Sequence, residues 1–381
     1  MTRLYIGVLS GTSMDGIDVA VVQFEPALHV VAAATLPFPA PLPQPLHTLD
    51  DDQIRALDAQ LGEAFGQAVR TVLLDAEVPT NQIAAIGSHG QTIRHQPPIS
   101  LQIGCPQRIA DITSLTTVAN FRAADLAAGG QGAPLAPLLH HALLSDANES
   151  RAVINLGGIA NITLLPRAGA GPVQGWDTGP ANCLLDLWHR RHASGPFDDN
   201  GQRAGRGQVQ HALLDRLLSD DYFAAPPPKS TGPDYFSAAW LDAHLAACAA
   251  AQRGSIDDVQ ATLSELTAIT VARALKSVPT ALRPQRAILC GGGCHNADLM
   301  ARLRRHWPDG VLCHSDQFGL NVDAVEAVLF AWLARERLAN RAQDTRHITG
   351  AAEAVLLGEV SAPRARRESS AASNPGATSD K

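Results

Sequence analysis

The sequence predicts an α/β protein built of two lobes. The chain has 381 residues, and a length of roughly 150 residues per domain suggests two domains. Apolar runs typical of buried strands alternate with segments of helical periodicity. A strand–glycine turn–strand unit opens the chain, and a second one lies at residues 151–165. Such an internal repeat indicates a duplicated architecture.

The composition narrows the function classes. Apolar residues make up 45% of the chain, charged residues 18%, and the formal net charge is −7. An acidic chain is a poor match for nucleic acid, because that affinity rests on clustered Lys and Arg. The N-terminus lacks a signal-peptide pattern, and no run approaches the roughly 18 apolar residues of a membrane span. We therefore expect a cytoplasmic protein that binds neither nucleic acid nor membrane, and a homodimer is left open.

The first element is a buried strand over residues 4–9, which leads through the polar turn Ser10–Asp18 into a second strand from Ile17. Glycine lets the backbone of such a turn approach a ligand closely. Successive N–H groups with Ser and Thr hydroxyls form a concavity suited to phosphate oxygens. An ordinary hairpin turn explains this stretch alone equally well, since Gly and Ser dominate turns for conformational reasons.

The rest of the first third alternates extended and helical segments. Alternating prolines predict an extended connector within residues 25–48, and apolar residues at three- and four-residue steps predict a helix over residues 49–74. A strand at residues 83–87 leads into a polar loop, Ser88-His-Gly-Gln-Thr92. In open α/β sheets, ligands bind at such carboxyl ends of strands.

A glycine- and alanine-rich segment, residues 119–134, separates this third from the remainder, and a helix at residues 135–144 follows it. The second lobe then opens with the strand pair at residues 151–165, whose turn contains Gly157 and Gly158. This turn is the counterpart of the polar turn near the N-terminus.

The second lobe continues with strands that end in polar loops. A strand at residues 173–176 ends in Asp177-Thr-Gly-Pro180. A long helix is predicted over residues 256–278, and the strand at residues 286–290 leads into the turn Gly291-Gly-Gly293, which opens another helix. Glycine-rich backbone at a helix start favours anions and nucleotides.

The last helix has one apolar face, with Glu326 at its edge; the face comprises Val322, Val325, Leu329 and Trp332. Residues 361–381 contain too few apolar residues to pack, so we expect a disordered tail. The pair Cys290 and Cys294 is a weak zinc signal, because no second ligand pair accompanies it.

Three glycine-rich turns after apolar strands, with acids at strand ends, suggest a nucleotide held between two lobes. The common nucleotide-binding and hydrolase signatures are missing: the sequence has no G-x-x-x-x-G-K-[ST], no G-x-G-x-x-G, no His-Arg-Asp with Asp-Phe-Gly and no G-x-S-x-G. What remains is a fold that contacts phosphates through hairpin turns, as in actin, the sugar kinases and the heat-shock chaperones.

Several motifs, in order along nearly the whole chain, resemble the anhydro-N-acetylmuramic acid kinase family. They are Ser10-Gly-Thr-Ser-Met-Asp-Gly-Ile-Asp18, Ser88-His-Gly-Gln-Thr92, Asn120-Phe-Arg-Ala-Ala-Asp125, Gly130-Gln-Gly-Ala-Pro134, Asn155-Leu-Gly-Gly-Ile-Ala-Asn161, Asp177-Thr-Gly-Pro-Ala-Asn182, Pro227-Pro-Lys-Ser-Thr-Gly232, Cys290-Gly-Gly-Gly293 and Glu326-Ala327.

The resemblance implies a two-lobed, actin-like (ribonuclease-H-like) ATPase fold with an active-site cleft between the lobes. Its lobes would span residues 1–127 with about 337–360, and residues 128–336. It also implies a bacterial enzyme of cell-wall recycling that uses ATP, Mg²⁺ and water to open the ring of 1,6-anhydro-N-acetylmuramic acid and phosphorylate O6.

The resemblance also assigns roles to residues. Asp177 falls on the catalytic base, and Glu326 falls on an acid that lies at the sugar, although a solvated helix acid is the competing explanation. The ATP-phosphate segment matches Gly11, Thr12, Ser13, Met14, Asp15, Gly16, Ile17 and Asp18. Fold analogy adds Gly157 and Gly158 as a second phosphate turn, and Gly291, Gly292 and Gly293 as the adenosine-side loop.

Other assignments stay open. Arg122 is a candidate for the lactyl carboxylate of the substrate, because a guanidinium matches a carboxylate in bidentate fashion; a structural pair with Asp125 explains it nearly as well. His89 is either a sugar ligand or a structural donor. Asp15 and Asp18 are candidates for organising hydrated magnesium, and the metal ligands are left unknown.

Two other functions compete with this one. A kinase of the same fold would phosphorylate an ordinary hexose hydroxyl, with Asp177 deprotonating the sugar. A non-catalytic actin-like scaffold would bind nucleotide without sugar-dependent turnover.

Overall fold

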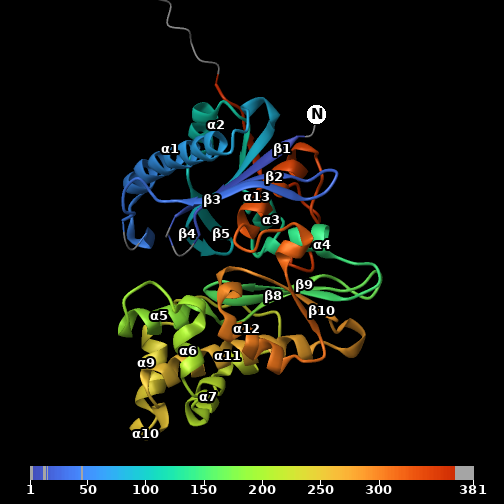
Figure 1. The fold of residues 1–381 in the computed structure, drawn as a ribbon. Helices are drawn as coiled ribbons and strands as arrows, with labels where there is room; N and C mark the ends of the chain where they lie inside the picture. The colour runs from blue at the N-terminus through green and yellow to red at the C-terminus, as the bar shows by residue number, and fades with distance from the viewer. Residues whose placement is uncertain (1–2, 12–13, 15, 44–45, 365–381) are drawn as a thin grey trace, which may run out of the picture.

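The computed structural model describes residues 3–11, 14, 16–43 and 46–364, and it divides into two lobes, each built on one sheet (Figure 1). Thr12, Ser13 and Asp15 of the predicted phosphate segment lie outside the described residues, as does the tail from residue 365. Within the predicted tail, Ser361 ends a strand, and the Arg364 N–H donates to Asp111 Oδ1 at 2.8 Å.

The first sheet has the strand order β12-β6-β4-β1-β2-β3, with β5 paired to β4. Strands β1, β2 and β3 form an antiparallel meander, whereas β4 runs parallel to β1, and β6 runs parallel to β4. The strands are β1 (Leu4–Leu9), β2 (Ile17–Gln23), β3 (His29–Leu36), β4 (Ile83–Gln96), β5 (Ile99–Ile103), β6 (Thr117–Ala119) and β12 (Glu359–Ser361).

The second sheet repeats this plan in the order β11-β10-β7-β8-β9. Its strands are β7 (Arg151–Leu156), β8 (Ile159–Leu165), β9 (Gln174–Pro180), β10 (Arg286–Cys290) and β11 (Val311–His314). Here β7, β8 and β9 are antiparallel neighbours, and β10 and β11 run parallel to β7. The same strand order and directions in both sheets confirm the predicted duplicated, ribonuclease-H-like α/β architecture.

Helices pack on these sheets and, in the second lobe, also on one another. They are α1 (Asp51–Asp75), α2 (Pro106–Thr113), α3 (Ala123–Ala127), α4 (Ala136–Leu144), α5 (Asn182–His192), α6 (Gln202–Arg206), α7 (His211–Leu218), α8 (Asp221–Ala224), α9 (Ala238–Ala246), α10 (Ala250–Arg253), α11 (Ile256–Ser277), α12 (Ala297–His306) and α13 (Val325–Leu338). In α1, Asp50 caps the N-terminus with Gln53 in a reciprocal capping box, which explains why the helix starts there.

Helix α13 packs on the first sheet, and a glycine permits its close approach. A Cβ on Gly7 of β1 would overlap the carbonyl oxygen of Ala327 in α13. The core beside α13 also contains Val153 and Ile288 from the second sheet, so this helix and α4 lie between the lobes. The predicted residue limits of the lobes, which divide α13 near residue 336, stay a prediction. The packing of α13 favours counting the whole helix with the first sheet.

Three local predictions are wrong and one is incomplete. The predicted extended connector is extended over residues 29–36, but there it forms strand β3, which pairs along β2. The loop at residues 88–92 is strand, because β4 continues through a bulge to pair with β5. Residues 177–180 likewise complete β9, since they pair with β8. Val322 precedes α13 instead of belonging to its face. The first three segments pair with the strand directly before or after them in the chain, whereas their prolines and glycines indicate turns when each segment is taken by itself.

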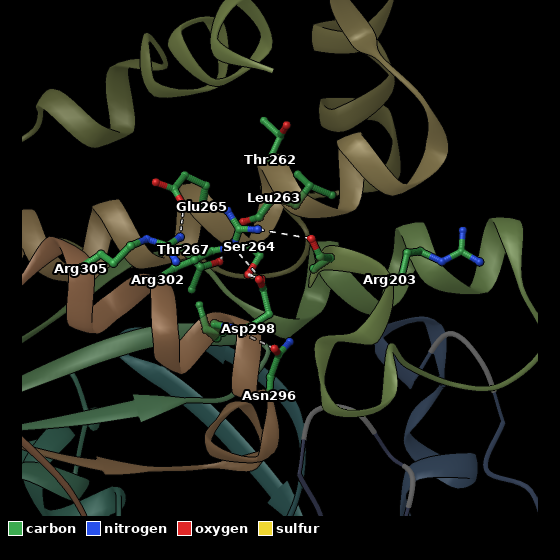
Figure 2. A network of polar contacts seen from close by, with 12 residues as sticks. Arg203, Thr262, Leu263, Ser264, Glu265, Thr267, Asn296, Asp298, Arg302 and Arg305 are labelled. Carbon is green, nitrogen blue, oxygen red and sulfur yellow. Dashed lines mark hydrogen bonds and ion pairs between the residues drawn. The ribbon is translucent and has the colours of Figure 1, made fainter. Parts of the chain in front are cut away.

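A buried polar network fixes α12 to the rest of the second lobe (Figure 2). The Arg302 side chain is only 6% exposed, and it donates to Asp298 at 2.6 Å and to Glu265 of α11 at 2.9 Å. Asn296 caps α12 by accepting from the Leu299 N–H at 3.0 Å. The network therefore holds the start of α12, directly after the triple-glycine turn, in one position.

Candidate active site

Asp177 lies in β9 on the second sheet and is tied to the loop at residues 226–232. Its Oδ2 accepts a hydrogen bond from the Thr231 N–H at 2.9 Å, and its own N–H donates to the Lys229 carbonyl at 3.0 Å. The Tyr222 hydroxyl donates to the Asp177 carbonyl at 2.7 Å. Lys229 in turn donates to the Tyr222 carbonyl at 2.8 Å. These contacts hold one carboxylate oxygen of Asp177 through Thr231 and its backbone through Lys229 and Tyr222.

The environment of Asp177 suits a general base. Burial raises its pKa to about 6, and the hydrogen bond from Thr231 only partly opposes this rise. A carboxylate with a pKa near the working pH combines substantial basicity with ionisation at neutral pH. The sequence alone suggests an ordinary aspartate, so this elevated pKa is a property of the folded chain.

Glu326, Arg122, His89 and Asp18 form a second group of polar residues, which we call the Glu326 cluster. Burial and the nearby charge of Asp18 raise the pKa of Glu326, while Arg122 opposes the rise. The Glu326 side chain is solvent-exposed, so protein atoms lie around it without sealing it from water. Among the described residues, the hydrogen-bond partners of Asp177 do not include a member of the Glu326 cluster.

Arg122 and His89 contact each other within the Glu326 cluster. Arg122 Nε and Nη2 lie 3.2 and 2.9 Å from His89 Nε2, and the His89 ring stacks on Phe330 at 4.5 Å between centroids. Burial and Arg122 lower the pKa of His89 to about 3. A neutral ring that accepts from Arg122 at Nε2 carries its proton on Nδ1. His89 therefore orients Arg122.

Asp125, the alternative partner of Arg122, is engaged elsewhere. Its Oδ2 accepts from the Gly132 N–H and its Oδ1 from the Thr349 hydroxyl, each at 2.7 Å. Asp125 is fully buried at this junction. The structure thus gives Asp125 a role in anchoring the segment after α3, apart from the Arg122 guanidinium.

The two glycine turns of the second lobe lie side by side. A Cβ on Gly291, whose φ is +84°, would overlap the Asn155 Oδ1 atom and crowd Leu156, directly before Gly157. Gly157 and Gly158 accept backbone hydrogen bonds from the start of α5. Gly292 and Gly293 belong to a short 3-10 turn, Gly292–His295, ahead of α12. Both turns therefore present backbone to the same region, and their roles as a phosphate turn and an adenosine-side loop stay predictions.

In the described part of the N-terminal turn, some residues stabilise the turn and Asp18 contributes a carboxylate to the Glu326 cluster. The Met14 N–H donates to the Gly11 carbonyl at 3.2 Å, and Gly16 and Ile17 are buried at the start of β2. Ile17 packs into the core of the first lobe, so its side chain supports the turn. Asp18 Oδ1 accepts from the Thr35 hydroxyl at 2.6 Å, which fixes that carboxylate within the Glu326 cluster.

Sequence reasoning missed Tyr222, Lys229 and Thr231 as supports of Asp177, and it missed Asn155 and Asn161 as side chains beside the turns. The alternation of Asn155 and Asn161 with apolar neighbours along the strands was the signal that could have placed both asparagines on the face opposite the core.

Within the described residues, no group of three or more His, Cys, Asp or Glu could hold a metal ion. A pocket of about 760 Å³ between α1 and α2 is lined by none of the predicted site residues.

The family model for anhydro-N-acetylmuramic acid kinase matches residues 3–363. The chain is 47% identical to the anhydro-N-acetylmuramic acid kinase of Xylella fastidiosa, covering 94% of this chain and 96% of the relative. It is 49% identical to the enzyme of that name from Xanthomonas campestris pv. campestris (94% and 97% covered) and 44% identical to that from Coxiella burnetii (93% and 96% covered).

Among solved structures, component A of the (R)-2-hydroxyglutaryl-CoA dehydratase of Acidaminococcus fermentans has a TM-score of 0.48 and 11% identity, over 87% of this chain and 98% of that chain. The match to the family model over almost the whole chain, together with these identities, shows that the chain belongs to the anhydro-N-acetylmuramic acid kinase family.

Proposed function

We propose that this protein is an ATP-dependent kinase that opens the 1,6-anhydro ring of 1,6-anhydro-N-acetylmuramic acid and phosphorylates O6. The products are N-acetylmuramic acid 6-phosphate and ADP, as peptidoglycan recycling requires. The observation that carries the proposal is Asp177, a half-buried carboxylate whose pKa is raised to about 6 in a member of this kinase family.

The proposed reaction balances as follows. A water oxygen attacks C1 of the sugar, and Asp177 accepts the proton that the water loses. The C1–O6 bond breaks as O6 bonds to the γ-phosphorus of ATP, whose bond to the β-phosphate oxygen breaks to release ADP. Phosphoryl transfer asks mainly for positioning and for stabilisation of negative charge. Backbone N–H groups of the glycine turns would provide part of that stabilisation.

Mg²⁺ fits the acid that the structure describes near the phosphate turn. Magnesium commonly binds through one or two carboxylates together with substrate phosphates and water. Asp18, held by Thr35 beside Glu326, would be the protein ligand, either directly or through water. When bound, the ion would neutralise charge on the phosphates.

The Glu326 cluster would bind the sugar. We assign the lactyl carboxylate to Arg122, with His89 orienting the guanidinium, since the two side chains are in contact. Glu326 would hold a sugar hydroxyl or the attacking water. ATP phosphates would contact Gly11–Asp18 and Gly157–Gly158, and the adenosine side would contact Gly291–Gly293.

The cellular setting completes the proposal. No helix in the described residues has the length and apolar character to cross a membrane. We propose a cytoplasmic enzyme whose partners are the anhydro-sugar and ATP, without nucleic acid or membrane. A homodimer is left open as its assembly state.

Labelled water tests the function. Turnover in H₂¹⁸O is expected to place one ¹⁸O at C1 of the product and none at the phosphate. Turnover without label would identify a kinase for an ordinary hydroxyl. Asp177→Asn should abolish sugar-stimulated ADP formation while nucleotide binding remains. A scaffold would instead show nucleotide binding and no sugar-stimulated ADP formation in the wild-type protein.

A further inference from the structure

We infer that Asn155 and Asn161 extend the Asp177 site into a continuous polar row across the second sheet, with Asn161 binding the attacking water and the sugar and Asn155 binding the transferred phosphoryl group. The inference rests on the proposed function. Neither asparagine was assigned a role above, and both come from the strand pair that surrounds the Gly157–Gly158 turn.

Strand register places the three side chains in line. Asn155 of β7 is the register partner of Asn161 of β8, and Asn161 is the partner of Asp177 of β9. On the other side, Asn155 is the partner of Cys290 of β10. Directly opposed residues have Cβ atoms about 4.5–5.5 Å apart. The carboxamide of Asn161 is therefore within reach of a water molecule bound to Asp177.

Core packing shows which face of the sheet carries this row. Ile154, Ile162 and Trp176, each one residue away from a row member, belong to the core that α11 and α12 cover. Val153 and Cys290 belong to the core between the lobes. Because strand residues alternate between faces, Asn155, Asn161 and Asp177 all point toward the first lobe.

Polar groups along the row have donor and acceptor atoms that can bind a ligand. Within the part of the chain that the structure describes, neither the Asn155 nor the Asn161 carboxamide has a hydrogen-bond partner, and both side chains are half-buried. The Thr231 hydroxyl beside Asp177 is buried and also lacks a partner there. Partly buried amides and hydroxyls lose hydrogen bonds to water on folding, so such a group favours a polar ligand.

The two ends of the row have different surroundings. One end of the row holds Asp177, the proposed base, with Thr231 as its hydrogen-bond donor. At the other, the Asn155 carboxamide lies between the glycine turns, since Cβ atoms on Gly291 and Gly157 would meet its Oδ1 and Nδ2 atoms. Neighbouring strands are about 4.8 Å apart, so the row spans about 10 Å. That length accommodates a water, a sugar ring and a phosphoryl group in sequence.

Steady-state kinetics of Asn161→Ala test the inference. If wild-type protein shows no sugar-stimulated ADP formation, the proposed function fails and the variants are not needed to show it. With an active wild type, Asn161→Ala should lower kcat by about 10-fold to 100-fold while the melting temperature stays unchanged, because a misplaced water loses alignment with C1. Unchanged kcat and KM would overturn the role of Asn161.

Asn161→Asp provides a readout that a purely structural role would not move. A second carboxylate beside Asp177 should raise the pKa of the base, shifting the acid limb of kcat/KM upward by about one pH unit or more. An unshifted limb in a folded, active variant would contradict the placement of Asn161 beside Asp177.

Asn155→Ala separates the two ends of the row. It should raise KM for ATP by about 10-fold with little change in KM for the sugar, as expected for loss of a hydrogen bond to a charged group. Gln174→Ala, an amide on the exposed start of β9, is the matched control and should leave all parameters unchanged. Equal effects from Gln174→Ala would show that any loss of polarity on this sheet impairs turnover, which would overturn the inference.

Discussion

The Thr231 N–H donates to Asp177 Oδ2 at 2.9 Å, so the proposed base is held by a loop that is 54 residues away in sequence. The same loop receives the Asp177 N–H at Lys229, and Tyr222 closes the arrangement through the Asp177 carbonyl. The orientation of the base therefore depends on the folding of residues 222–231 against β9. This coupling makes the loop part of the catalytic apparatus in the proposed reaction.

The acid limb of activity should report Asp177. Its pKa is raised to about 6, and its carboxylate form is the proposed base, so kcat/KM should fall about tenfold per pH unit below pH 6 and level off above it. A pH profile under substrate-limiting conditions measures this. Asp186→Asn is the matched control, because burial raises the pKa of Asp186 to about 6 as well. Loss of the limb in that control would assign the titration to Asp186.

Arg122→Lys should reduce kcat/KM for 1,6-anhydro-N-acetylmuramic acid by about 10-fold, because an ammonium cannot make the bidentate contact of a guanidinium. The anhydro-sugar that lacks the lactyl group, 1,6-anhydro-N-acetylglucosamine, should react equally with both proteins. Steady-state kinetics with the two sugars measure the difference. An equal loss for both would mean that Arg122 acts through His89 and Glu326 and not on the lactyl carboxylate.

Protonation of His140 should destabilise the protein in acid. His140 of α4 is 1% exposed, its Nδ1 lies 2.9 Å from the Thr163 hydroxyl, and burial lowers its pKa to about 4. The neutral ring favours the folded state fully above the unfolded pKa of about 6.5, and this stability is lost as pH falls toward 4. The free energy of unfolding, measured by urea titration, should drop by up to about 3 kcal/mol over that range.

Comparison with His140→Asn isolates this contribution, since other titrating groups are common to both proteins. The variant should show a flatter pH dependence of stability between pH 6.5 and 4. His141→Asn changes the exposed neighbour and should retain the wild-type slope. If His140→Asn also retains it, another group dominates the acid sensitivity.

Arg302→Met should destabilise the second lobe by about 3 kcal/mol. Removing this buried cation leaves the Asp298 and Glu265 carboxylates without their principal partner in a desolvated site (Figure 2). Urea unfolding measures the change. Arg305→Met is the control on the same helix: Arg305 is 60% exposed and 3.7 Å from Glu265, so its removal should cost less than about 1 kcal/mol. Equal costs would argue that the buried network contributes no special stability.

Local pattern predicted most elements, and the errors have a common cause. Periodicity placed α1, α4 and α11 within a few residues, and it placed β10 at its observed limits. It failed at residues 88–92 and 177–180, where glycine and proline signalled turns but pairing with the neighbouring strands β5 and β8 continued the strands. Such pairing is a tertiary property, and a single stretch of sequence does not contain it.

Apolar periodicity in the sequence by itself determined the duplicated α/β plan, and ordered motifs determined the family, whose resemblance predicts Asp177 as the base. Tertiary structure decided the chemistry around them. Desolvation, which depends on packing, raises the pKa of Asp177 to about 6, and strand register aligns it with Asn161 and Asn155. Long-range contacts also directed Arg122 toward His89 and Asp125 toward Thr349, a choice between partners that spacing along the chain could not make.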